Sequence, residues 1–335
     1  MRFFYLTLII FLLFSCDNTE TNRKKLIDFA PLNTSVIIKS ANIDDLKSSI
    51  KNSEFLQKIS ISKSFKNLKN RLELLNYLKP KDDILICLSN DSNDSLHFSL
   101  ITKHSSDLFI TDSLKNYSEE TLKYNNHTIT KSTIANNIFY STMVDSTFFA
   151  SSSEEIVDAV FNKVKLNTDL EKIYQTISNN KTCSIILNSK NSFIESIFKE
   201  DSLSLNKFTH FVAVDIDISQ NSLLINGITK ATDSSQSLIN IFKNTIPQEN
   251  QIENIVPSNS DGFMSFTFND FKTFEYNLAK FNHKDSIANA TTLFNDIVEV
   301  GVIYEDNNHA IVLNSTDIIA SKDALLGEQT MLDTF

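Results

Sequence analysis

Glycine is scarce in this chain of 335 residues, and its scarcity excludes several common kinds of ligand site. The four glycines lie far apart, so no cluster exists that could form a phosphate-binding loop or a dinucleotide fingerprint. Tryptophan is absent, and 41 acidic residues against 31 basic ones give a formal net charge of −10. Proteins that bind nucleic acid usually carry a basic excess. We therefore expect neither a cofactor nor a nucleic-acid partner.

The first sixteen residues have the pattern of an export signal. Met1 and Arg2 give a positive start, and the apolar run from Phe3 to Phe14 is too short to span a membrane as a permanent helix. Its length is typical of a signal-peptide core. The run ends in Leu13-Phe14-Ser15-Cys16, which resembles the lipobox of bacterial lipoproteins. In that family a Leu lies three positions before the cysteine, and small residues follow it. Phe14 departs from the small residue usual at its position.

This resemblance implies cleavage of residues 1–15 and lipidation of Cys16 on its thiol and on its new amino group. More than one acyl chain is needed for stable attachment to a membrane. The resemblance therefore implies membrane lipid as a partner, and a location at the outer membrane on its periplasmic or cell-surface side. Residues 16–27 are mostly polar and read as a tether. The alternative is an ordinary signal peptide with an incidental cysteine.

Two cysteines remain in the mature chain, Cys87 and Cys183, both inside apolar segments typical of strands. A disulfide between them is chemically allowed outside the cytoplasm. Two isolated cysteines give no disulfide framework, so we expect buried free thiols.

The chain repeats itself, and the repeats predict an α+β fold. Residues 29–50 and 255–278 both read as a strand that runs into a helix with an Asn or Asp cap, with Pro31 matching Pro257. A second pair of segments, 145–156 and 315–326, predicts strands that end at Ala150-Ser151 and Ala320-Ser321 and turn into helices. In the first of these, Ser152 and Glu155 have the spacing of a capping box.

Four hairpins are predicted between these repeated segments, because strand-like sequences flank turns rich in Asn, Asp and Ser. They are 84–90 with 95–103, 138–144 with 147–151, 209–218 with 221–230, and 298–304 with 309–314. We therefore expect duplicated units of antiparallel sheet covered by helices, a first unit at 28–165 and a second at 166–335. The pattern is similar to that of a lipoprotein family of unknown function whose members tend to be longer. The resemblance implies that the chain is C-terminally truncated.

Candidate sites for chemistry are few. The best carboxylate pair is Asp215 and Asp217, which alternate along one predicted strand face and are weak candidates for holding a divalent cation. We favour a wet strand face, on which replacing both would change stability little. The segment 91–95 carries Asp and Asn residues but lacks the Gly and distal Glu of a calcium loop, and it fits a hairpin turn.

No motif for a catalytic nucleophile is present, and the six histidines show no metal-ligand spacing. The sequence therefore predicts no catalytic residues and a non-catalytic binding or scaffolding module, with a protein partner in the envelope. Two alternatives stay open. One is an envelope hydrolase whose site is assembled from residues distant in sequence. The other is a carrier or chaperone that holds an apolar ligand.

Overall fold

The computed structural model describes residues 24–59, 73–108, 117–124, 127–134, 137–162, 168–191, 194, 205–283, 294–306 and 308–329. Cys16, the lipobox and most of the expected tether lie outside these residues. Thirteen strands lie in the described part of the chain: β1 (Thr34–Ser40), β2 (Ile84–Asn90), β3 (Leu96–Lys103), β4 (Ser118–Tyr124), β5 (His127–Ile134), β6 (Asn137–Val144), β7 (Thr147–Ser151), β8 (Cys183–Asn188), β9 (Phe211–Ile218), β10 (Leu223–Lys230), β11 (Gly262–Thr267), β12 (Ile297–Glu305) and β13 (Asn308–Ser315).

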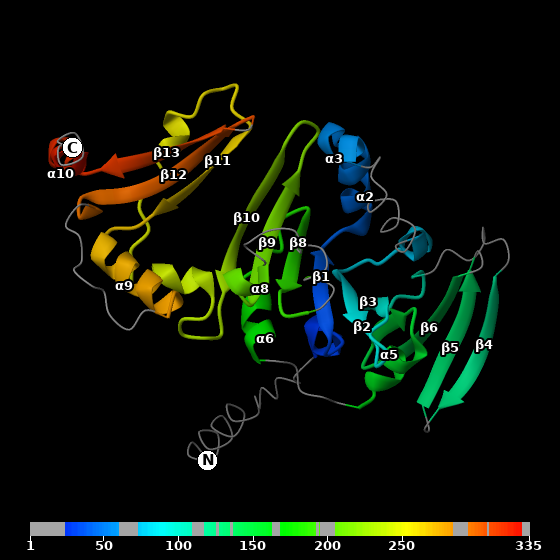
Figure 1. The fold of residues 1–335 in the computed structure, drawn as a ribbon. Coiled ribbons are helices and arrows are strands. Elements are labelled where there is room, and N and C mark those ends of the chain that lie inside the picture. Colours follow the sequence, from blue (N-terminus) through cyan, green and yellow to red (C-terminus); the bar gives the residue numbers. More distant parts are fainter. Residues whose placement is uncertain are drawn as a thin grey trace, which may run out of the picture. The chain divides into compact units, whose positions relative to one another are not determined.

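Helical segments connect these strands. The α-helices of the described residues are α2 (Ile43–Asn52), α3 (Glu54–Ile59), α5 (Glu154–Ala159), α6 (Thr168–Tyr174), α8 (Leu205–Phe208), α9 (Phe271–Phe281) and α10 (Ile318–Gln329). Short 3-10 turns are η1 (Leu26–Phe29), η2 (Glu73–Tyr77), η3 (Leu238–Phe242) and η4 (Ile252–Asn254). The fold is α+β, as the sequence predicts (Figure 1). None of the helices in the described ranges is both long and apolar enough to cross a membrane.

The strands form two sheets. A ten-stranded sheet has the order β10-β9-β8-β1-β2-β3-β7-β6-β5-β4, and a three-stranded sheet has the order β11-β12-β13. Three predicted hairpins are confirmed by antiparallel register, namely β2 with β3, β6 with β7, and β12 with β13. In the fourth, β9 and β10 are neighbours, and the Ser219 N–H donates to the Ser222 carbonyl across their turn.

The chain divides into two compact units, Met1–Ile186 with Ala213–Asn226, and Leu187–Val212 with Gly227–Phe335. These bounds differ from the expected division into 28–165 and 166–335. The reason is that β8 is hydrogen-bonded to β1, so the first unit extends along the chain to Ile186.

The predicted strand-to-helix steps are confirmed at both repeats. β1 is followed by α2, whose cap is Asn42, and β11 is followed by α9, whose cap is Asp270. The Asn42 Oδ1 accepts from the backbone N–H groups of Asp44 and Asp45 at 3.0 and 3.2 Å. The Asp270 Oδ1 accepts from the N–H of Lys272 at 3.0 Å, so each side chain satisfies otherwise unpaired donors of its first turn.

The expected equivalence of the Ala-Ser steps is wrong. Ala150 and Ser151 end β7, whereas Ala320 and Ser321 lie inside α10, which already begins at Ile318. The cause is local: the Asp317 Oδ1 accepts from the N–H of Ala320 at 2.9 Å and so starts the helix earlier. The cap of α5 is Ser153 rather than Ser152, because its side chain accepts from the N–H of Ile156.

The core of the first unit lies around the middle strands of the large sheet. Ile84, Leu85, Ile86 and Cys87 are successive residues of β2 and all are buried, so both faces of this strand are covered. Phe149 on β7 is fully buried as well. The hairpins and turns at the ends of these strands are therefore attached to a buried core.

Candidate functional site

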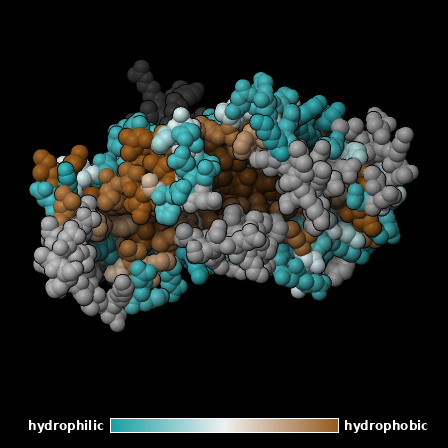
Figure 2. All heavy atoms as spheres, turned by 45° about the horizontal axis from the view of Figure 1, so that its top comes forward, coloured by the Kyte–Doolittle hydropathy of each residue, from teal (hydrophilic) through white to brown (hydrophobic). Residues whose placement is uncertain are grey.

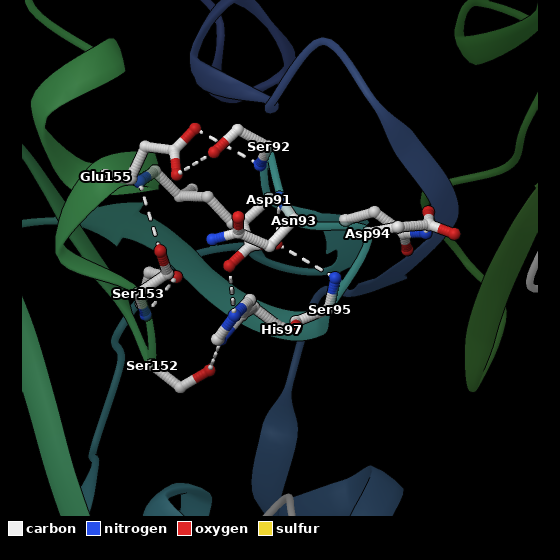
Figure 3. Close-up of polar contacts among 12 residues, drawn as sticks. Asp91, Ser92, Asn93, Asp94, Ser95, His97, Ser152, Ser153 and Glu155 are labelled. Atoms are coloured by element: carbon white, nitrogen blue, oxygen red, sulfur yellow. Dashed lines mark hydrogen bonds and ion pairs between the residues drawn. The ribbon is translucent and has the colours of Figure 1, made fainter.

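A chain of polar contacts joins the turn between β2 and β3 to the corner between β7 and α5 (Figure 3). His97 lies between Ser152 and Asp91: its Nδ1 is 3.0 Å from the Ser152 Oγ, and its Nε2 is 3.1 Å from the Asp91 Oδ2. A carboxylate only accepts, so the Nε2–H donates to Asp91, and in the neutral form of the ring the Nδ1 accepts from the Ser152 hydroxyl. We call these three residues the His97 chain.

The turn itself is held by Asp91. Its Oδ1 accepts from the N–H groups of Asn93 and Ser95 at 2.9 and 2.8 Å, and these bonds, with that of Ser95 the strongest, lower the pKa of the Asp91 carboxyl. Asp94 adopts a positive φ of 60°, as a tight turn requires. This segment is therefore the predicted hairpin turn.

The His97 chain has the contact order of a serine hydrolase triad, but the surrounding groups oppose that chemistry. In a nucleophile elbow, the N–H following the serine stabilises the oxyanion. Here the Ser153 N–H donates to the Ser151 Oγ at 3.2 Å. The Glu155 carboxylate is turned toward the β2–β3 turn, where it accepts from the N–H and the hydroxyl of Ser92 (Figure 3). The contacts of the His97 chain connect the β2–β3 turn to the β7–α5 corner.

Asp215 and Asp217, the predicted carboxylate pair, have separate partners. The Asp215 carboxylate accepts from the Ser178 N–H at 3.0 and 3.2 Å and from the Ser184 hydroxyl at 2.5 Å. Asp217 forms an ion pair with Lys181 at 2.6 Å. Within the described residues, no three His, Cys, Asp or Glu side chains are grouped so that they could hold a metal ion.

The expectation that both carboxylates project into water is wrong for Asp215. Phe211 and Ala213, on the same strand face, are buried, and the Ser184 partner is 2% exposed. Strand alternation alone does not reveal that the loop between α6 and β8 covers this face. Asp215 therefore anchors a loop rather than facing solvent.

We expect Asp215→Ala to lower the free energy of unfolding by about 2 kcal/mol, because it leaves a backbone N–H and a buried hydroxyl without their charged acceptor. Asp217→Ala on the same strand is the matched control. Its ion pair is more than a third exposed on both sides, so we expect no measurable change. Urea unfolding followed by circular dichroism measures both. Equal losses in the two variants would contradict the distinction.

Cys87 and Cys183 are both free and buried, as predicted. Burial raises the pKa of the Cys87 thiol to about 12 and that of the Cys183 thiol to about 11. Both side chains are therefore neutral thiols at pH 7, which makes them poor nucleophiles and poor metal ligands.

A cavity of about 510 Å³ lies against the outer strands of the large sheet, and we call it the β4–β7 cavity. Its walls are mostly polar and come from four strands and two flanking segments: His104, Glu119, His127, Thr128, Thr130, Ser132, Ser141, Thr142, Met143, Phe148 and Phe161. This volume lies within the range of small-molecule sites. None of the three residues of the His97 chain lines it.

Sequence reasoning missed this cavity because it missed β4 and β5. Both strands are dominated by Thr, Ser, Lys and Glu, and only Ile129 and Ile134 of β5 are buried apolar residues. Such a pattern shows no clear alternation between apolar and polar positions. The frequent threonines, which favour strands, were the available signal.

The second unit exposes apolar side chains around its three-stranded sheet. Met264 on β11 and Ile311 on β13 both pair with Val302 of β12, so they share one face, and they are 38% and 68% exposed. Ile318 and Ile319 at the start of α10 are 74% and 75% exposed. Brown apolar residues gather on the left of Figure 2, where Figure 1 places β11 to β13 and α10.

Comparisons with known proteins give little. No family model and no curated protein matches the chain. Among solved structures, the chain is similar to crystal form III of TP0453, with 10% identity, a TM-score of 0.36, and coverage of 68% of this chain and 90% of that one. For crystal form I of TP0453 the identity is 11%, the TM-score 0.33, and the coverage 62% and 78%. These similarities are too weak to carry an argument about function.

Proposed function

We propose that this chain is a lipid-anchored protein of the cell envelope, held at the outer membrane through Cys16, whose folded part is a binding module without catalytic chemistry. The lipobox at Leu13-Phe14-Ser15-Cys16 supports the anchor. The β4–β7 cavity is the observation that carries the binding role, because it combines a suitable volume with many polar side chains.

The alternatives receive less support from the same geometry. A carrier for an apolar ligand needs an apolar interior, whereas the β4–β7 cavity is lined mainly by hydroxyls, histidines and a carboxylate. A hydrolase needs an oxyanion site beside its nucleophile, and the N–H that follows Ser152, that of Ser153, is already bonded to the Ser151 hydroxyl oxygen. Binding without chemistry is the function these residues fit best.

We expect Cys16→Ala to abolish incorporation of a fatty-acid analogue, because the thiol is the first acylation point that the motif offers. Metabolic labelling in a bacterial host, followed by gel fluorescence, measures it. Phe14→Ala is the matched control, because it brings the motif closer to the usual pattern and should keep the label.

Two outcomes would contradict the proposed function. Equal label in Cys16→Ala and the wild type would remove the anchor. Covalent capture of the purified protein by a fluorophosphonate probe, lost in Ser152→Ala, would show that the His97 chain activates its serine and would favour the hydrolase.

A further inference from the structure

The register of the outer strands places four polar residues of the β4–β7 cavity on one sheet face. Glu119 of β4 lies opposite Ser132 of β5, and Thr130 of β5 lies opposite Ser141 of β6. Directly paired residues project to the same side of a sheet, and so do residues two apart along a strand. One carboxylate and three hydroxyls are therefore presented together toward the cavity.

The hydroxyls of this face are available to a ligand. In the described part of the chain, no hydrogen bond engages the side chains of Thr130, Ser132 or Ser141, and each residue is half-buried. Thr142 points to the other side and donates its hydroxyl to the Thr128 carbonyl at 3.0 Å. A row of uncommitted hydroxyls in a concave surface supplies both donors and acceptors.

Flat apolar surface borders these hydroxyls. The His127 ring stacks on the Phe161 ring with centroids 3.9 Å apart and planes 6° apart, so each ring fixes the other. Met143 of β6, which pairs with the buried Phe148 of β7, lies on the same face as the hydroxyls and is 45% exposed. The cavity thus combines ring and thioether surface with hydrogen-bonding groups.

The chemistry of the lining selects among ligand classes. An anion is disfavoured, because no Lys or Arg belongs to the described lining and Glu119 contributes a negative charge. The His and Glu side chains of the lining do not form a metal-binding group within the described residues. A purely apolar ligand would leave the hydroxyls without partners. A neutral sugar meets both requirements, since its C–H faces pack on rings while its hydroxyls exchange hydrogen bonds.

We propose that the β4–β7 cavity binds a neutral oligosaccharide, with Thr130, Ser132, Ser141 and Glu119 bonding its hydroxyls and the Met143 thioether and the His127–Phe161 rings contacting its apolar faces. This inference rests on the proposed binding function and names the ligand class of that module. The lipid anchor does not depend on it.

The test uses the full-length protein in detergent, fluorescently labelled, on an array of neutral and acidic glycans. We expect retention on neutral glycans. For the best of them, Thr130→Val combined with Ser141→Ala should weaken binding at least about ten-fold, because two hydrogen bonds are lost with little change of shape. Thr133→Val is the matched control on β5. Its side chain projects to the opposite face and outside the lining, so its affinity should equal that of the wild type.

Unchanged circular dichroism establishes that the double variant folds, and Ser132→Ala alone serves as a second variant with an expected loss of several-fold. Retention on acidic glycans alone, retention on none, or equal affinity of the hydroxyl variants and the wild type would each overturn the sugar assignment. Such a failure is distinguishable from failure of the anchor, which the fatty-acid label of Cys16 reports separately.

Discussion

Glu299→Ala is expected to lower the free energy of unfolding of the second unit by at least about 3 kcal/mol. Glu299 lies on β12, fully buried, and its carboxylate accepts from four groups. These are the Gln251 N–H at 3.0 Å, the Ile252 N–H at 3.3 Å, the Ser265 hydroxyl at 2.6 Å and the Asn314 amide at 3.2 Å. Removing the acceptor leaves several buried donors without partners, and each carries a desolvation penalty.

Urea unfolding followed by circular dichroism measures this loss. Glu299→Gln should give an intermediate loss, because every partner donates and only one oxygen of the amide accepts. Glu305→Ala is the control on the same strand, since Glu305 is exposed and bonds Asn259 at the surface. Stability of Glu299→Ala equal to that of the control would show that the carboxylate does not hold the sheet together.

Acid is expected to weaken the second unit through Asp233. Burial acts to raise the pKa of this carboxyl, but hydrogen bonds from the Ser237 hydroxyl and the N–H groups of Ser237, Gln236 and Ser235 outweigh it and lower the pKa to about 2. The ordinary value is 3.8, so the folded state binds this proton less readily than the unfolded chain. The stabilisation is therefore fully present above pH 3.8 and is lost as the pH falls toward 2.

The expected size of this loss is about 2 kcal/mol. Glu299 adds to it in the same direction, because its hydrogen bonds outweigh burial and hold its pKa below the ordinary 4.5. Unfolding free energies measured in urea between pH 5 and pH 2 should fall more steeply for the wild type than for Asp233→Ala. Asp323→Ala, an exposed change on α10, should keep the slope of the wild type. Identical slopes in all three proteins would contradict the role of Asp233.

Hairpins and strand-to-helix steps could be predicted from the sequence because their signals are local. Asp145 and Ser146 between β6 and β7 have φ of 49° and 60°, the left-handed values that two-residue turns between strands require. Aspartate tolerates such values better than most residues, so the turn could be found from its composition. By contrast, β4 and β5 carry polar residues on both faces and show no clear alternation, so their frequent threonines were the only local signal that their sequences offered.

The same difference between local signals and long-range pairing applies to the site residues. Asp91 and His97 are six residues apart, but Ser152 reaches them only because β3 pairs with β7. The partners of Asp215 are Ser178, in the loop before β8, and Ser184, on β8, both more than thirty residues earlier. Strand pairing between distant segments depends on the whole sheet, and a single sequence does not carry it. The likeness of the Ala-Ser steps misleads for a related reason, since the cap at Asp317 decides where the helix begins.

The two buried thiols carry a consequence for refolding. Their high pKa values belong to the folded state, because burial is the leading cause in both cases. Once the chain unfolds, Cys87 and Cys183 return to the ordinary thiol pKa, and a fraction of each becomes thiolate near neutral pH. In air or in an oxidising compartment, such chains crosslink with themselves or with one another. Thermal unfolding of this protein should therefore be reversible with a reductant present and become irreversible without one.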